Sequence, residues 1–158
     1  MRVYADTSFV VKLLTQEPGT ATAVANYRSL GRPAVFFLPL HRLEVANAIR
    51  QKAFHQRRTT RASERSSIKR ERDTAFALLQ KYISRKTFIE ISESTETAIE
   101  RALQLSEKYT ERLGCRAFAL LHVALALQLE SEVFLTCDGN QGALAQAEGL
   151  EVTLSEDA

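Results

Sequence analysis

The chain has 158 residues, the length of one domain with a substantial core, so we expect a single domain over residues 1–158. Hydrophobic residues make up 45% and charged residues 25%, which is ordinary for a globular protein and excludes a low-complexity chain. The longest apolar run, residues 118–127, is too short to span a bilayer and contains a histidine, so we expect no membrane partner.

The cysteines and the N-terminal residues bear on the compartment. Cys115 and Cys137 form no disulfide framework and no metal-binding pair, so we expect reduced thiols. The first apolar run is interrupted by Asp6 and Lys12, which is unlike a signal peptide. Both features predict a cytoplasmic protein.

The elements are read from apolar runs and helical spacing. Strands are expected at residues 2–5, 34–38, 88–91, 133–136 and 150–154. Helices are expected at residues 9–14, 21–30, 40–53, 60–85, 95–113, 117–127 and 139–147. This alternation predicts an α/β fold with a short, mostly parallel, roughly five-stranded sheet and helices on both faces.

Charge is unevenly distributed along the chain. The net charge is only +2, but residues 50–72 hold nine lysines and arginines against two glutamates, a net of +7. The remainder therefore carries a net charge of −5. We interpret residues 56–72 as a basic helical projection, with a disordered loop over residues 56–66 as the competing interpretation.

The basic segment has two interpretations, one functional and one structural. The first is contact with the RNA backbone, for which the candidates are Arg57, Arg58, Arg61 and Arg65. The second is a solvated helix. Phosphate binding is favoured because the charge exceeds what solubility requires. Phe54 is the only aromatic residue in the segment, so no stacking platform is expected.

Three acidic residues have related settings. Asp6 ends the first predicted strand, Asp138 ends the fourth, and Glu44 lies early in the helix after the second. In a parallel sheet all three would open toward the same edge. Clustered carboxylates need a cation, and a hard ion such as Mg²⁺ or Mn²⁺ suits their oxygen atoms. Taken singly, each acid is better explained structurally, Asp6 and Asp138 as helix caps and Glu44 as a solvated helix residue. Their convergence on one edge is what favours a metal site.

Two further side chains invite a functional interpretation. Arg116 begins the central helix near the acidic edge, where it would contact a phosphate or form a structural ion pair. His122 lies on an apolar helix, where a buried, hydrogen-bonded histidine is commoner than a catalytic one.

The ordered set of motifs resembles the PIN-domain ribonucleases of the VapC toxin type. The resemblance rests on VYADTS at residues 3–8, LEVANAI at 43–49, GCRA at 114–117, LLHVA at 120–124 and FLTCD at 134–138. It covers almost the whole chain and implies a PIN-like three-layer α/β/α fold.

The resemblance also implies a function. Similar proteins are Mg²⁺- or Mn²⁺-dependent endoribonucleases, usually homodimers held inactive by a cognate antitoxin. It implies that Asp6, Glu44 and Asp138 are catalytic acids of the metal site, supported by Thr7 or Ser8 and by Asn47. An apolar surface for a partner is expected among the early helices, with the candidates Val10, Leu14 and Leu43.

One position departs from the family pattern. Ala119 stands where similar proteins carry an aspartate that is usually a metal ligand, and no neighbour replaces it. The change is either natural or engineered; the intact motifs around it favour an engineered one. Metal binding and cleavage are expected to be impaired. The alternative is a non-catalytic PIN-like protein that binds RNA or an antitoxin. A phosphoacceptor signalling domain is disfavoured, because the required late lysine is missing.

Overall fold

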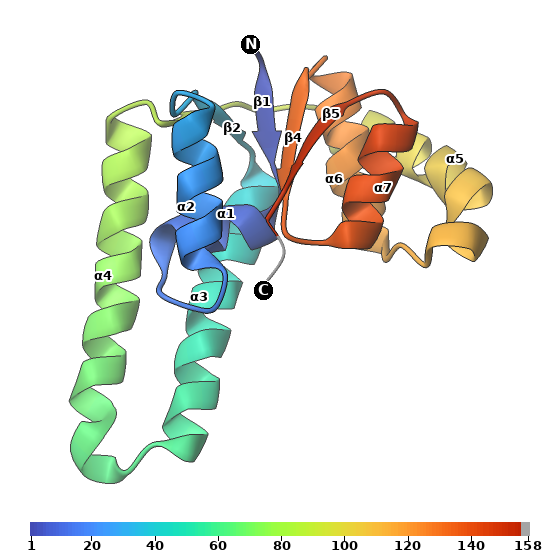
Figure 1. Cartoon of the computed structure of the whole chain (residues 1–158). Coiled ribbons are helices and arrows are strands. Elements are labelled where there is room, and N and C mark those ends of the chain that lie inside the picture. Colours follow the sequence, from blue (N-terminus) through green and yellow to red (C-terminus); the bar gives the residue numbers. More distant parts are fainter. Residues whose placement is uncertain (156–158) are drawn as a thin grey trace.

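The computed structural model describes residues 1–155, in which strands and helices alternate (Figure 1). The elements are β1 (Val3–Ala5), α1 (Thr7–Leu14), α2 (Thr20–Ser29), β2 (Val35–Phe37), α3 (Pro39–Thr59), a 3₁₀ turn (Ala62–Glu64), α4 (Arg65–Ser84), β3 (Phe88–Glu90), α5 (Thr95–Leu113), α6 (Ala117–Gln128), β4 (Val133–Thr136), α7 (Gly139–Ala147) and β5 (Glu151–Leu154). The predicted α/β class with a short parallel sheet is confirmed.

The strand order places a change of direction beside β1. The five strands lie in the order β3-β2-β1-β4-β5, and every neighbouring pair is parallel. The chain moves outward from β1 through β2 to β3, then crosses back to β4 on the other side of β1. In open parallel sheets, ligands bind at the carboxyl ends of strands where the order reverses in this way. That crevice lies between β1 and β4.

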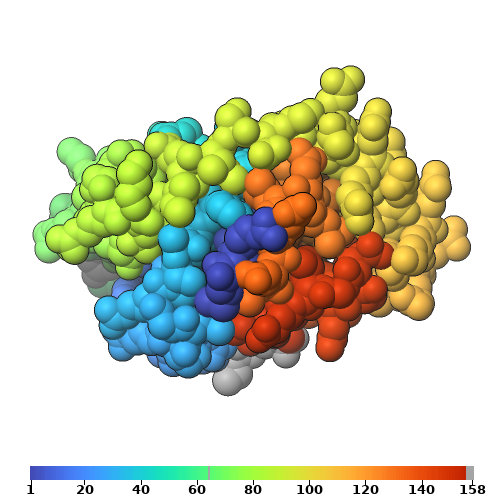
Figure 2. Space-filling model, turned by 90° about the horizontal axis from the view of Figure 1, so that it is seen from above, coloured from blue at the N-terminus to red at the C-terminus, as the bar shows by residue number. Residues whose placement is uncertain are grey.

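The sheet separates two apolar clusters, because successive side chains of a strand point to opposite faces. On one face Val3, Ala5 and Leu135 pack with α1, α2, α3 and α4. On the other face Tyr4 and Phe134 pack with α5, α6 and α7. Seen from the amino ends of the strands, the N-terminal residues lie at the centre, between the pale-blue and the orange segments (Figure 2). The strands of the crevice are therefore held from both sides.

Helices α3 and α4 form a hairpin that extends beyond the carboxyl ends of the strands (Figure 1). Helix α3 runs six residues further than predicted, to Thr59, and α4 begins at Arg65 rather than at residue 60. Ala53 and Ile68 are buried where the two helices pack, and Gln56 of the added residues donates to Glu71 of α4 at 3.0 Å. Residues 56–66 are therefore mostly helical.

No helix within residues 1–155 combines the length and the hydropathy that a membrane span requires.

Candidate functional site

Two of the predicted acids border the crevice between β1 and β4. Asp6 follows β1 directly, and its backbone N–H donates to the carbonyl of Leu135 at 2.9 Å, which continues the pairing of the two strands. Asp138 lies two residues beyond the end of β4 and begins α7. Each is thus at the carboxyl edge of the sheet, as the sequence predicted.

The Asp6 carboxylate is buried and fully hydrogen-bonded. Its Oδ1 accepts from the backbone N–H of Phe9 at 2.9 Å, which caps α1, and from the hydroxyl of Ser8 at 2.7 Å. Its Oδ2 accepts from the hydroxyl of Thr136 at 2.9 Å. Burial raises the pKa of Asp6, and this is opposed by the charge of His122 and by these hydrogen bonds. The group is therefore an unusually basic carboxylate.

The Thr136 hydroxyl connects the two aspartates. It donates to Asp6 and accepts from the backbone N–H of Asp138 at 2.9 Å. The Asp138 carboxylate accepts from the backbone N–H of Gln141 at 3.1 Å and so caps α7. Both aspartates are thus helix caps and residues of the crevice at once. The capping interpretation and the site interpretation do not exclude each other.

Glu44 reaches the same region from α3 and meets His122 of α6. Its Oε2 accepts from Nε2 of His122 at 2.6 Å and from the hydroxyl of Thr7 at 2.8 Å. Burial alone would raise the pKa of Glu44, but the hydrogen bond and the charge of His122 hold that pKa below its ordinary value. The carboxylate therefore stays ionised and is held in place by two donors.

His122 links Glu44 to the core. Because a carboxylate only accepts, Nε2 of His122 carries a proton, and Nδ1 of the same ring is hydrogen-bonded to the Tyr4 hydroxyl at 2.8 Å. Burial, then the charges of Asp6 and Glu44, raise the pKa of Tyr4 well above its ordinary value. Tyr4 therefore remains a hydrogen-bond donor at neutral pH. His122 is buried and hydrogen-bonded, as its apolar helix indicated.

His41 is a residue that the sequence did not single out. Its Nδ1 accepts from the backbone N–H of Leu38 at 3.1 Å, and its Nε2 donates to the carbonyl of Ala5 at 2.8 Å. It therefore caps α3 and ties that helix to the end of β1, which places Glu44 beside the crevice. Burial lowers the pKa of His41 to about 3. The available signal was its place three residues into the helix, where a side chain can return to the first N–H.

The remaining predicted residues divide into two groups. Thr7 and Ser8 lie within the network, since Ser8 also accepts from the backbone N–H of Cys137 at 3.0 Å. Asn47 and Arg116 are exposed, and neither forms an ion pair or side-chain hydrogen bond within residues 1–155. At position 119, the carbonyl of Ala119 accepts from Nε2 of Gln141 at 3.2 Å.

The donor set was tested against the divalent metal that the resemblance implies. Asp6, Glu44 and Asp138 each accept hydrogen bonds from protein donors, and Ala119 adds no oxygen from its side chain. Among residues 1–155, no group of three histidine, cysteine, aspartate or glutamate side chains is placed to hold an ion. Within the part of the chain that the structure describes, these side chains therefore do not form a complete metal site, and the catalytic roles of the three acids stay a prediction.

The comparisons with known proteins give the family. The PIN domain family matches residues 3–150, which is nearly the whole chain. The protein belongs to the PIN domain family, whose members are generally nucleases and typically use divalent metal ions. No curated protein matches the chain.

The lowered pKa of His41 makes stability depend on pH. Native His41 stays neutral down to about pH 3, whereas the unfolded side chain takes a proton near its ordinary pKa of 6.5. The unfolded state then binds more protons, so stability falls as pH decreases through 6.5. From about pH 7.5 to about pH 5.5 this residue should remove about 1.4 kcal/mol. Between these two pH values, the free energy of unfolding in urea should therefore fall by about 1.4 kcal/mol less in His41→Gln than in the parent chain.

The control for this measurement is His55→Gln, because His55 is exposed on the same helix. In His55→Gln the free energy of unfolding should change between the two pH values by as much as in the parent chain. If His41→Gln also showed the parent's change, His41 would not be the source of the pH dependence.

The bridging hydroxyl of Thr136 can be removed with little change in shape. Thr136→Val leaves the buried Asp6 carboxylate and the N–H of Asp138 each without one partner. An unsatisfied buried group costs about 1–3 kcal/mol, so the free energy of unfolding in urea should fall by at least this amount at neutral pH. Thr153→Val on β5 is the control and should have a clearly smaller effect. Equal losses in both variants would show that the bridge is not important.

Proposed function

We propose that the chain is the toxin component of a toxin–antitoxin pair, an endoribonuclease of the metal-dependent type in which Ala119 impairs cleavage. One observation carries the proposal. Asp6 and Asp138 lie on either side of the point where the strand order reverses, joined through the Thr136 hydroxyl. A fold of this kind binds ligands at that crevice, and two carboxylates there suit a cation-assisted reaction on a phosphodiester.

In this proposal Asp6, Glu44 and Asp138 are the acids for Mg²⁺ or Mn²⁺. When bound, such an ion activates water and neutralises charge on the phosphate. Ser8 and Thr136 orient Asp6, and Thr7 orients Glu44 through their hydrogen bonds. Arg116 and Asn47 are exposed and available to a phosphate or sugar of the substrate.

The impairment follows from the chemistry of the donor set. Mg²⁺ favours several oxygen ligands and gives up water reluctantly, so each missing carboxylate weakens binding. One oxygen of Glu44 and both oxygens of Asp6 accept hydrogen bonds from protein donors. An ion that binds at these oxygens competes with the protons of Ser8, Thr136 or His122. We infer that metal is bound weakly in this chain.

A second candidate function is a non-catalytic PIN-like protein that binds RNA or an antitoxin. The observation in its favour is the Glu44–His122 pair at 2.6 Å, which occupies a carboxylate that the nuclease needs. In this alternative the fold is retained for binding, and the acids serve as caps and core hydrogen-bond acceptors.

The proposed partners of the cytoplasmic toxin are the RNA substrate, a second copy and an antitoxin. Of the three apolar residues that the sequence offered for a partner surface, Val10 and Leu14 are buried and only Leu43 is exposed. The exposed side chains of Leu103 and Phe118, by contrast, line one groove of about 240 Å³ between α5 and α6. Exposed apolar residues that gather in this way support a contact with protein.

Restoring the acid tests the nuclease proposal. Ala119→Asp should raise Mn²⁺-dependent cleavage of single-stranded RNA at least about tenfold, because even residues that only orient a metal ligand change activity about 10- to 100-fold. Cleavage is followed by gel electrophoresis of labelled RNA, with and without EDTA.

The control for restored cleavage is the double variant Ala119→Asp, Asp6→Asn, which should return activity to the background. Ala119→Gln supplies a larger side chain without the charge and should not restore cleavage. If Ala119→Asp binds RNA but does not cleave it with Mn²⁺, the non-catalytic alternative is correct.

Sedimentation velocity tests the second copy. The chain of 17.7 kDa should sediment with about twice that mass. Leu103→Lys should shift the distribution to the monomer if the α5–α6 groove is the contact. Leu43→Lys is the matched variant, because both leucines are more than 60% exposed. A monomer at all concentrations in the parent chain would contradict the homodimer.

A further inference from the structure

The outer face of the α3–α4 hairpin carries a groove lined by three arginines and a phenylalanine. Arg50, Phe54 and Arg57 are spaced four and three residues apart on α3, so they share one face of the helix. Arg72 approaches from α4. These four residues, with Ala53 at the base, line a groove of about 230 Å³. The groove brings together charges that are 22 residues apart in the sequence.

Phe54 is exposed without serving the core. Its side chain is 55% exposed, and it packs in neither apolar cluster of the domain. The guanidinium of Arg58 lies 5.7 Å from the centre of the ring, but Arg58 does not line the groove and so contacts the ring from outside it. An aromatic ring beside a groove of cations is the arrangement on which proteins stack the bases of single-stranded nucleic acid.

The arginines of the groove are arranged to receive an anion. Arg50 is anchored over the ring of Phe76 at 4.9 Å, and Arg72 is held by Asp73 at 2.7 Å. Arg57 is exposed and forms no ion pair within residues 1–155. Asp73 is thus the one acid that contacts the groove arginines among the described residues. The net charge of the groove is positive, which complements a phosphate backbone.

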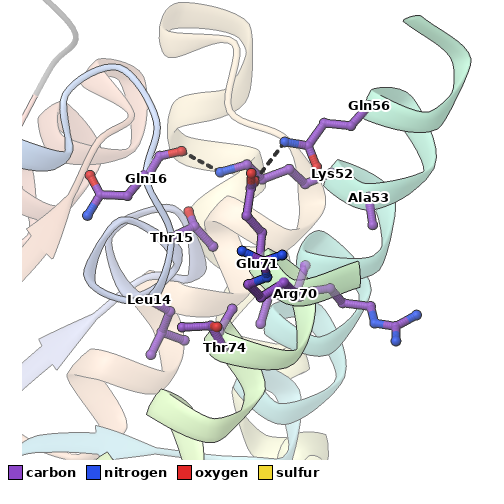
Figure 3. Close-up of a pocket in the computed structure, with 12 residues that line it drawn as sticks. Leu14, Thr15, Gln16, Lys52, Ala53, Gln56, Arg70, Glu71 and Thr74 are labelled. Atoms are coloured by element: carbon purple, nitrogen blue, oxygen red, sulfur yellow. Dashed lines mark hydrogen bonds between the residues drawn. The ribbon is translucent and has the colours of Figure 1, made fainter. Parts of the chain in front are cut away.

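The opposite face of the hairpin is different in kind. There α1, α3 and α4 enclose a cleft of about 180 Å³, shown in Figure 3. Lys52 there donates to the carbonyl of Gln16, and Gln56 donates to Glu71 (Figure 3). Arg70 and Arg72 also line this cleft, but Glu71 lies among them, whereas no acid of the described residues lines the outer groove. The outer groove is therefore the better site for an anionic ligand.

We propose that this groove binds single-stranded RNA, with a base stacked on Phe54 and the adjoining phosphates contacted by Arg57, Arg50 and Arg72. The inference rests on the proposed function only in taking RNA as the ligand. It revises the sequence expectation, because Arg57 is retained, Arg58 supports the ring, and Arg61 and Arg65 lie outside the groove.

The position of the groove allows RNA that is bound there to reach the crevice between β1 and β4. The hairpin extends beyond the carboxyl ends of the strands (Figure 1). Asp6 follows β1 and Asp138 precedes α7 after β4, so both lie at that edge. Along α3, Phe54 is ten residues from Glu44, a rise of about 15 Å. A strand held at the groove therefore reaches the crevice within a few nucleotides. Phe54 and the arginines are positioning residues, since they touch RNA away from the reacting phosphate.

Binding is measured by fluorescence anisotropy with a short labelled single-stranded RNA of mixed sequence. EDTA is present throughout, so neither metal nor cleavage enters the result. Phe54→Ala should weaken binding roughly 5- to 150-fold, the loss typical of one stacked base, while the dependence on salt stays unchanged. Arg57→Gln should lower the slope of log affinity against log salt by about 0.7, the value for one lost phosphate contact.

Matched controls separate the groove from general charge and exposure. Phe118→Ala removes a phenylalanine that is equally exposed, at 57%, but lies on α6. Arg70→Gln removes an arginine of the same hairpin that lines the other cleft. Each should change affinity less than its groove counterpart. Circular dichroism confirms that all variants are folded, which is expected because these side chains are mostly exposed.

Three results would overturn the proposal. They are unchanged binding in Phe54→Ala, equal weakening by Arg57→Gln and Arg70→Gln, and equal affinity for double-stranded RNA with no dependence on Phe54. Polyglutamate that binds with the same dependence on Phe54 would assign the groove to an acidic protein segment instead. The outcome is independent of the nuclease proposal. If the groove variants lose RNA binding and Ala119→Asp does not cleave RNA, only the groove proposal is supported. If Ala119→Asp cleaves RNA and the groove variants bind RNA like the parent chain, only the nuclease proposal is supported.

Discussion

The buried carboxylate of Asp6 is the group on which the geometry of the crevice depends. A charge removed from water must be matched by donors, and here three donors come from two elements: Phe9 and Ser8 of α1, and Thr136 of β4. Satisfying one carboxylate therefore fixes the start of α1 against the end of β4. The N–H of Asp138 then docks on the same Thr136 hydroxyl, which sets the start of α7. The crevice between β1 and β4 is thus shaped by hydrogen bonds to one acid.

A second set of contacts brings α3 and α6 to the same place. His41 ties the first turn of α3 to the carbonyl of Ala5, and His122 joins Glu44 on α3 to Tyr4 in the sheet. Both histidines pack around the Tyr4 ring, at centroid distances of 5.0 and 5.8 Å. The network gives each acid at least one protein donor. A cation at the crevice competes with those donors for the same carboxylates, so the contacts that stabilise the fold also weaken metal binding.

The sequence predicted elements well where local signals were complete. The bounds of α5, β4 and α7 match the structure, because Ser94 and Gly114 cap α5 and Asp138 caps α7. It underestimated α3, whose last turns are polar and are stabilised by α4 rather than by their own apolar spacing. It missed the bond from His41 to the carbonyl of Ala5 and the bond from Thr136 to Asp6, because each joins residues far apart in the sequence. The sequence did not predict the groove on the outer face of the hairpin for the same reason, because Arg72 lies near Phe54 only after the hairpin forms.

The charge distribution gives the two proposals a common physical basis. A crevice bordered by three acids repels a phosphate backbone, whereas a hairpin with a net charge of +7 over residues 50–72 attracts it. In the two proposals, affinity comes from the hairpin and chemistry from the crevice, where a cation would neutralise the acids. In the proposed nuclease, alanine at position 119, where similar proteins carry an aspartate, lacks a metal ligand but also lacks a negative charge that opposes RNA. On that proposal binding and cleavage respond to this position in opposite directions, so strong RNA binding with weak cleavage is the behaviour that it predicts.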